Sequence, residues 1–268
     1  MMAWDLGGNW RNELLRLRMA KTLSRERIEE FFPPYPGDAA PKIPDLKALY
    51  SGIEKKLAPD RVFSHLDPDM VPGSNSWAVS GARSASGKPL LANDPHLGLT
   101  APPVWYFAHL HAPGVDAIGG TLPGGPGIVL GRNQRIPWGL TNTGADVQDL
   151  YLEKQEGEFA RREEVIKVKG APDERLTVRL SRHGPVISDV SRSADEAVPR
   201  GYALSLAWTA LAEDDLTMQA GLKLSQARDW PAFLAVARDL HSPPQSVRYA
   251  DVDGNIGFIG PGRIPLRK

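Results

Sequence analysis

Gly73 and Ser74 form a junction whose residue types could carry out chemistry on their own peptide bond. A serine hydroxyl can attack the carbonyl that precedes it, and an N→O acyl shift followed by hydrolysis then cuts the chain. Such a cut would leave Ser74 as a new N-terminus with a hydroxyl nucleophile and a free α-amine. An α-amine titrates near ~7.7–8, so it could serve as the base for the adjacent hydroxyl. Gly73 suits a strained bond because glycine tolerates backbone conformations that other residues avoid.

The segments that must position Ser74 change character at this junction. Upstream, residues 10–31 show helical spacing of apolar side chains, residues 31–44 are rich in proline, and residues 45–57 predict a second short helix. Residues 58–73 are polar and contain prolines, which indicates a connector that leads to the Gly73–Ser74 bond.

Downstream of Gly73, apolar and polar residues alternate with the period of two that is typical of strands. The strand-like segments, separated by Gly, Pro and Asp turns, cover residues 74–81, 88–94, 104–111, 115–122, 127–133, 135–143 and 149–154. A charged hairpin over 163–187 is expected outside the core. Two amphipathic helices, 214–226 and 229–240, precede a strand, a turn and a strand over 246–260. Strands, then helices, then strands predict an α+β fold rather than alternating βαβ units.

Composition narrows the classes of function. The 268 residues carry 32 Lys and Arg against 32 Asp and Glu, so the chain has no net charge that would favour nucleic acid or an anionic membrane surface. No apolar run approaches the ~20 residues of a membrane helix. The absence of cysteine excludes disulfides, thiolate metal sites and a cysteine nucleophile.

Five blocks of sequence resemble the penicillin amidase family, both in identity and in order. They are GSNSWAVSG, PLLANDPHLGL, GLTNTGADVQDLYLE, RHGPVISD and YADVDGNIGFIGPGRIPLR. The resemblance implies an N-terminal-nucleophile hydrolase with a four-layer αββα sandwich, made as one precursor and matured into an α/β heterodimer. It also implies hydrolysis of a small linear N-acyl amide of the penicillin, cephalosporin or acyl-homoserine-lactone type, in the periplasm or outside the cell.

The same resemblance suggests how the chain is divided. Residues 1–57 would be the end of an α chain, residues 58–73 a linker that ends at the cleavage site, and residues 74–268 the first part of a β chain. The chain is therefore expected to be a partial precursor.

Four residues match catalytic positions of the family. Ser74 is the nucleophile, and His96 would lie near its hydroxyl and α-amine, where it could orient the serine or tune the amine. The backbone N–H of Asn142 matches one donor of the oxyanion hole. Ser246 stands where relatives commonly carry Asn as the second donor. Either Ser246 donates with altered geometry, or Gln245 compensates, or the chain is weakly active.

Asp146, Gln148 and Asp149 match positions that bind a structural calcium ion in the family, Gln148 through its carbonyl. Hard oxygen ligands at this density suit Ca²⁺. Solvated turn carboxylates are the alternative, because the α-chain ligand is not identifiable beyond a weak match at Asn9. No organic cofactor is implied.

Two other functions stay open. The chain could be an inactive acylase fragment that serves only as a structural or binding scaffold. It could also be a zinc hydrolase that uses His96, His109 and His111. His109 and His111 fall on one face of a predicted strand, as zinc ligands would, but no third ligand is evident in the sequence, and packing of the two rings is the expected outcome.

Overall fold

A computed structural model describes residues 2–33, 46–50, 73–97, 101–125 and 127–267. The chain forms two compact units. One contains Met1–Gly7, Pro68–Val147 and Thr209–Lys268, and the other contains Gly8–Asp67 and Gln148–Trp208. We call them the sheet unit and the helical unit, and each is described by itself.

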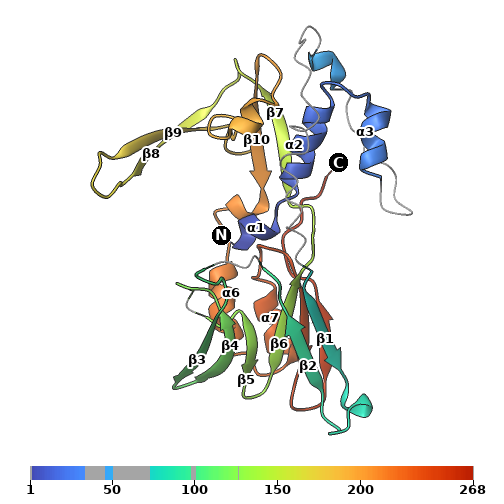
Figure 1. Ribbon diagram of the computed structural model, residues 1–268. Helices are drawn as coiled ribbons and strands as arrows, with labels where there is room; N and C mark the ends of the chain where they lie inside the picture. The colour runs from blue at the N-terminus through green and yellow to red at the C-terminus, as the bar shows by residue number, and fades with distance from the viewer. Residues whose placement is uncertain (1, 34–45, 51–72, 98–100, 126, 268) are drawn as a thin grey trace. The chain divides into compact units, whose positions relative to one another are not determined.

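The sheet unit is built on six antiparallel strands in the order β12-β11-β6-β5-β4-β3 (Figure 1). Their alternating patterns and short turns agree with the strands predicted from the sequence. The strands are β3 (Tyr106–Ala112), β4 (Val115–Thr121), β5 (Leu130–Asn133), β6 (Pro137–Asn142), β11 (Gln245–Ala250) and β12 (Ile256–Ile259).

Helices α6 (Thr217–Leu224) and α7 (Trp230–Ala237) cover one face of this sheet (Figure 1). Helix α7 begins where the Asp229 side chain accepts a hydrogen bond from Ala232 N at 2.8 Å, as an N-cap does. Phe233 of α7 packs with Trp138 and Tyr249 of the sheet, and all three are almost fully buried. This apolar layer fixes which side chains of β6 and β11 point away from the helices.

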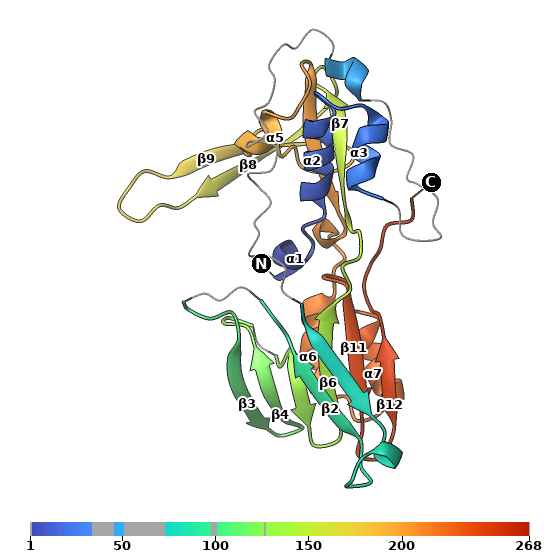
Figure 2. The same ribbon diagram turned by 45° about the vertical axis from the view of Figure 1, so that its right-hand side comes forward.

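A separate hairpin, β1 (Asn75–Val79) and β2 (Leu90–Asp94), lies against β6 and β11 on the other face of the sheet (Figure 2). Ser76, Ala78, Leu91 and Asn93 of the hairpin are half-buried, whereas Trp77 on its outer side is 66% exposed. The sheet unit thus has helix, sheet and hairpin layers. The αββα sandwich as a whole stays a prediction.

The helical unit packs α2 (Trp10–Met19) on the strand pair β7 (Gln148–Lys154) and β10 (Tyr202–Trp208). Leu14, Leu17 and Met19 of α2 join Leu204 and Leu206 of β10 in its core. The charged hairpin predicted outside the core is present and mostly exposed, as β8 (Ala160–Ile166) and β9 (Glu174–Leu180). The remaining short elements are α1 (Met2–Leu6) and the 3-10 turns η2 (Gly81–Arg83) and η3 (Thr209–Leu211) in the sheet unit, with α3 (Arg25–Phe31), η1 (Lys47–Tyr50) and α5 (Arg192–Asp195) in the helical unit.

Three expectations about elements need correction. The continuous helix predicted over 10–31 is two helices, because Ser24 caps a new one at Arg25 by accepting from Arg27 N. The helix predicted over 45–57 is a 3-10 turn at Lys47–Tyr50 as far as it is described, and residues 51–72, with nearly all of the predicted connector, lie outside the described residues. Strand β10 was not predicted.

Among the described residues, no helix is both long and apolar enough to cross a membrane.

Candidate active site around Ser74

Ser74 lies at the start of the β1–β2 hairpin, where the returning chain reaches it. The antiparallel register sets Asn75 opposite Asp94. Pro95 has no N–H and cannot continue the ladder, so the chain leaves β2 and passes beside Ser74. The backbone N–H of His96 donates a hydrogen bond to Ser74 Oγ at 3.0 Å. The structure thus brings together the two residues that the sequence singled out.

The His96 ring contacts the carbonyl group of the bond that Ser74 is predicted to cut. His96 Nδ1 lies within hydrogen-bond contact of Gly73 O. A carbonyl oxygen only accepts, so this contact requires the proton on Nδ1. On the other side of the ring, Nε2 lies 3.3 Å from Asp94 Oδ1. Each ring nitrogen of His96 thus faces an oxygen acceptor.

Asn93 ties the hairpin to the central sheet. Its Nδ2 donates to Asn75 O at 2.9 Å and to Leu140 O at 3.0 Å, and its Oδ1 accepts from Leu140 N at 2.9 Å. A Cβ at Gly139 would lie 2.8 Å from Asn93 Cβ, so only glycine leaves room for this side chain. Asn93 therefore fixes the hairpin that begins next to Ser74 against β6. Sequence reasoning assigned no role to Asn93, although an Asn inside a strand is itself unusual.

The two predicted oxyanion donors lie on neighbouring strands. Asn142 ends β6 and pairs with Gln245, while Ser246 of β11 pairs with Thr141. The hairpin strand β1 contacts both β6 and β11. The Asn142 side chain donates to Leu6 O at 3.0 Å and accepts from Gly144 N, so it is engaged in holding local structure, as expected if only its backbone has a role in catalysis.

Side-chain direction separates Ser246 from Gln245. Residues directly opposite in a pair share a face, and Arg248 lies opposite Gly139, the residue that touches Asn93. Ser246 is two residues away on the same strand, so it points to the hairpin side. Gln245 points the other way, is buried, and donates through Nε2 to Pro244 O at 3.0 Å. The idea that Gln245 replaces the missing donor is therefore disfavoured by its direction.

The residues matched to the family's calcium site belong partly to each unit. In the helical unit, Asn9 Nδ2 donates to the carbonyl oxygen of the buried Gln148 at 2.6 Å. Carboxylate oxygens of Glu13 and Asp149 lie within 4.8 Å of each other. In the sheet unit, Asp146 pairs with Arg267 at 3.1 Å. These oxygen donors are of the kind that Ca²⁺ prefers, and Glu13 was not found from the sequence.

His109 and His111 are not packed, which corrects the expectation from the sequence. Their side chains are 54% and 78% exposed, and Asp116 of the next strand lies beside them. The hydrogen bonds from His109 and Gln134 lower the pKa of Asp116 below its usual range. His96 contacts Gly73 and Ser74 instead, so the structure does not bring the three histidines of the predicted zinc hydrolase together.

Comparison with known proteins shows to which family this chain is similar. The profile of the family Penicillin amidase matches residues 1–268. The acyl-homoserine lactone acylase QuiP of Pseudomonas aeruginosa is 28% identical over the whole chain, which covers 34% of that protein. The penicillin acylase 2 proenzyme of Pseudomonas sp. is 32% identical over 73% of this chain and 26% of its own length.

Solved structures agree with the sequence relatives. The penicillin G acylase from Alcaligenes faecalis matches with a TM-score of 0.58 and 29% identity, over 71% of this chain and 35% of its own. The chain thus spans about a third of the length of the relatives it matches. The chain belongs to the penicillin amidase family.

Proposed function

We propose that this chain carries the nucleophile of an N-acyl amide hydrolase that is activated by cutting itself between Gly73 and Ser74. The observation that carries the proposal is the contact of His96 with both sides of that bond. Its backbone N–H holds Ser74 Oγ, and its ring faces Gly73 O. Ser74 Oγ as the nucleophile and His96 Nδ1 as a donor to the developing oxyanion thus lie at the same carbonyl group, that of Gly73.

Self-cleavage follows from these contacts in two steps. Ser74 Oγ attacks the Gly73 carbonyl carbon, and the negative charge that develops on Gly73 O is stabilised by the N–H at His96 Nδ1, with Asp94 holding the ring from its other side. The proton of the Ser74 hydroxyl passes to the Ser74 nitrogen as the C–N bond breaks, which leaves Gly73 esterified to Ser74 Oγ and frees the α-amine. Water hydrolyses the ester, releasing the Gly73 carboxylate and the Ser74 hydroxyl.

Substrate hydrolysis would use the same oxygen. The α-amine of Ser74 accepts the hydroxyl proton while Oγ attacks the amide carbonyl of the substrate. The Asn142 backbone N–H and the Ser246 hydroxyl are the proposed donors to the tetrahedral oxyanion, each worth roughly 3–4 kcal/mol if well aimed. The amine leaves, and water then releases the acid from the acyl ester.

The relatives guide the wider proposal. Their names describe acylases of acyl-homoserine lactones and of penicillins, and one is named a proenzyme. We accordingly propose a small linear N-acyl amide as substrate and an α/β heterodimer as the mature form. From the resemblance of its sequence blocks to the family, we also propose a periplasmic or secreted location and a structural calcium ion held through Asp146, Gln148 and Asp149. Calcium would supply charge neutralisation and rigidity there rather than a step of the reaction.

Trapping the acyl ester tests the proposed activity. An activated N-acyl or O-acyl substrate should acylate one residue of the matured chain, and peptide mapping by mass spectrometry should place the acyl group on Ser74. Ser74→Ala should remain unlabelled, whereas Ser80→Ala, which removes a serine at the other end of β1, should be labelled normally. A matured chain that is never acylated would favour the second reading, an inactive scaffold, which the Ser at position 246 supports.

A further inference from the structure

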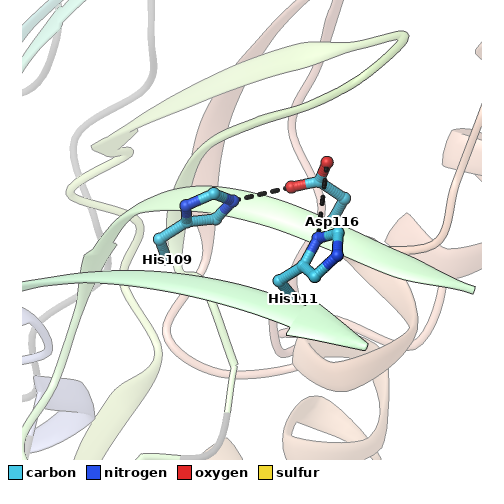
Figure 3. A group of neighbouring side chains, drawn as sticks. All are labelled: His109, His111 and Asp116. Atoms are coloured by element: carbon cyan, nitrogen blue, oxygen red, sulfur yellow. Dashed lines mark hydrogen bonds and ion pairs between the residues drawn. The ribbon is translucent and has the colours of Figure 1, made fainter. Parts of the chain in front are cut away.

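His109 and His111 of β3 and Asp116 of β4 converge on one face of this hairpin (Figure 3). His109 Nε2 lies 2.7 Å from Asp116 Oδ1, and His111 Nδ1 lies 3.8 Å from Asp116 Oδ2. The ligand atoms of all three side chains lie within 4.8 Å of one another. Asp116 is therefore the third group that the sequence did not reveal.

The local fold fixes this convergence. His109 and His111 are two residues apart on β3, so they share a face. A two-residue turn, Pro113–Gly114, with φ 83° at Gly114, sets the register of the hairpin. That register places Asp116 directly opposite His111. The ligands are thus held by paired strands rather than by a loop.

The exposed character of the two imidazoles needs an explanation. On the opposite side of β3, Ala108 and Leu110 pack against the apolar core under the helices, so His109 and His111 contribute nothing to that core. A hollow of ≈ 150 Å³ borders His111 and Asp116 on the side of Gln134 and Arg135. Water could therefore complete the coordination of an ion held by the three side chains.

We propose that His109, His111 and Asp116 form a binding site for one divalent transition-metal ion with the ligand preferences of Zn²⁺. Ligands at 2.0–2.2 Å in a tetrahedral site are about 3.3 Å apart. The distances of 2.7 Å from His109 Nε2 to Asp116 Oδ1 and of 3.8 Å from His111 Nδ1 to Asp116 Oδ2 lie on either side of that value. Two imidazoles and one carboxylate favour Zn²⁺, Ni²⁺ or Cu²⁺ over Ca²⁺ or Mg²⁺. The ion would take the place of the N–H that His109 Nε2 directs at Asp116 Oδ1, and the neutral ring would then carry its proton on Nδ1.

Gln134 supplies the support that a metal-bound carboxylate usually has. Its Nε2 donates to Asp116 Oδ2 at 2.9 Å, which leaves Oδ1 directed at His109. Loss of such an outer partner weakens metal affinity by about 10- to 100-fold in known sites. The site ties β3, the outermost strand of the sheet, to β4.

A matched pair elsewhere in the chain serves as the control. His183 Nδ1 lies 2.7 Å from Glu153 Oε1, the same separation as His109 from Asp116. Within the described ranges, no further histidine or carboxylate joins His183 and Glu153 in a group of three. This pair tests whether any histidine–carboxylate contact would bind the ion.

The proposal is tested by titrating the tag-free 268-residue chain with zinc at neutral pH and measuring the heat of binding by calorimetry. We expect about one ion per chain, at least tenfold weaker binding for His109→Gln and for His111→Gln, about tenfold weaker binding for Gln134→Ala, and unchanged binding for His183→Gln. Circular dichroism verifies that each variant is folded. In the unsubstituted chain, zinc should shift the imidazole NMR signals of His109 and His111 and leave that of His183 in place.

The proposal is overturned if the unsubstituted chain binds no zinc, or if both His109→Gln and His111→Gln bind it as tightly as the unsubstituted chain does. Zinc-induced shifts confined to other histidines would overturn it as well, and that result does not depend on any variant being folded. None of these readouts requires amide hydrolysis, so the outcome is independent of the function proposed for Ser74.

Discussion

The side chain of Asn93 and the peptide groups of Leu140 exchange two hydrogen bonds, one in each direction, at 3.0 and 2.9 Å. Because the same side chain also donates to Asn75 O, the residue next to Ser74 is tied to the strand that ends at Asn142. The predicted nucleophile and the predicted oxyanion donor are therefore positioned by one amide group.

Asn93→Ala should loosen this connection. It leaves two carbonyl groups and one N–H without their partner, and we expect a loss of about 2 kcal/mol in the free energy of unfolding, together with slower self-cleavage. Urea denaturation measures the first effect and intact-mass kinetics the second. Asn12→Ala, at an exposed site on α2, is the control. If Asn93→Ala unfolds and cleaves like the unsubstituted chain, Asn93 has no positioning role.

Gly139→Ala tests the same contact from the other strand. The added methyl would lie 2.8 Å from Asn93 Cβ, so Asn93 must shift and its hydrogen bonds must lengthen. We expect destabilisation by about 1–3 kcal/mol, as in other overpacked sites, with slower self-cleavage. Gly221→Ala, in helix α6 with no atom near the added methyl, should instead keep or raise stability. Equal stability of the two variants would argue against a tight Asn93–Gly139 contact.

Two roles are considered for His96, that of a donor to the oxyanion in self-cleavage and that of the base in substrate hydrolysis. Substitutions of His96 separate them. If the N–H at Nδ1 stabilises the oxyanion of self-cleavage, His96→Ala, which has no side-chain donor, should slow that reaction by about 10²-fold. The amide of His96→Gln can still donate, so this variant should cleave faster than His96→Ala. Intact-mass kinetics measure the self-cleavage rates of both variants. Normal cleavage of His96→Ala would assign the scissile carbonyl to another donor.

For substrate hydrolysis, the base is predicted to be the α-amine of Ser74, and His96→Gln should then keep substantial activity. The rate of the unsubstituted enzyme should rise with pH through an apparent pKa between about 6 and 8. The ascending limb should be similar in the variant. Loss of that limb, together with nearly all activity, would make His96 the base instead.

Ser246→Asn tests the altered oxyanion hole. The serine hydroxyl points to the hairpin side of the sheet but reaches less far than an amide would. In the matured enzyme, we expect the acylation rate to rise, by up to the ~10²-fold that one such donor can supply. Gln245→Ala should have little effect on that rate, because Gln245 points to the opposite face. A slower Ser246→Asn enzyme would mean that the pocket is built around the hydroxyl.

The resemblance to the family predicted that Ser74 and His96 are neighbours. Periodicity and turn residues, which are local signals, predicted most strands of the sheet unit. It did not reveal that Asn93 bonds to Leu140 or that Gly139 makes room for it, since strand packing decides those contacts. Asp116 was missed as a neighbour of His109 for a related reason, because its position depends on the hairpin register. Strand β10, YALSLAW, is buried over most of its length and lacks the clear alternation that marks half-buried strands.

Cleavage of the peptide bond between Gly73 and Ser74 is the central claim, and intact-mass analysis with N-terminal sequencing of the purified chain measures it most directly. We predict two products, 1–73 and 74–268, with a new N-terminus that reads Ser-Asn-Ser-Trp, and no cleavage in Ser74→Ala. A chain that stays whole under conditions where it is folded, or a Ser74→Ala variant that is cut at the same bond, would contradict the account.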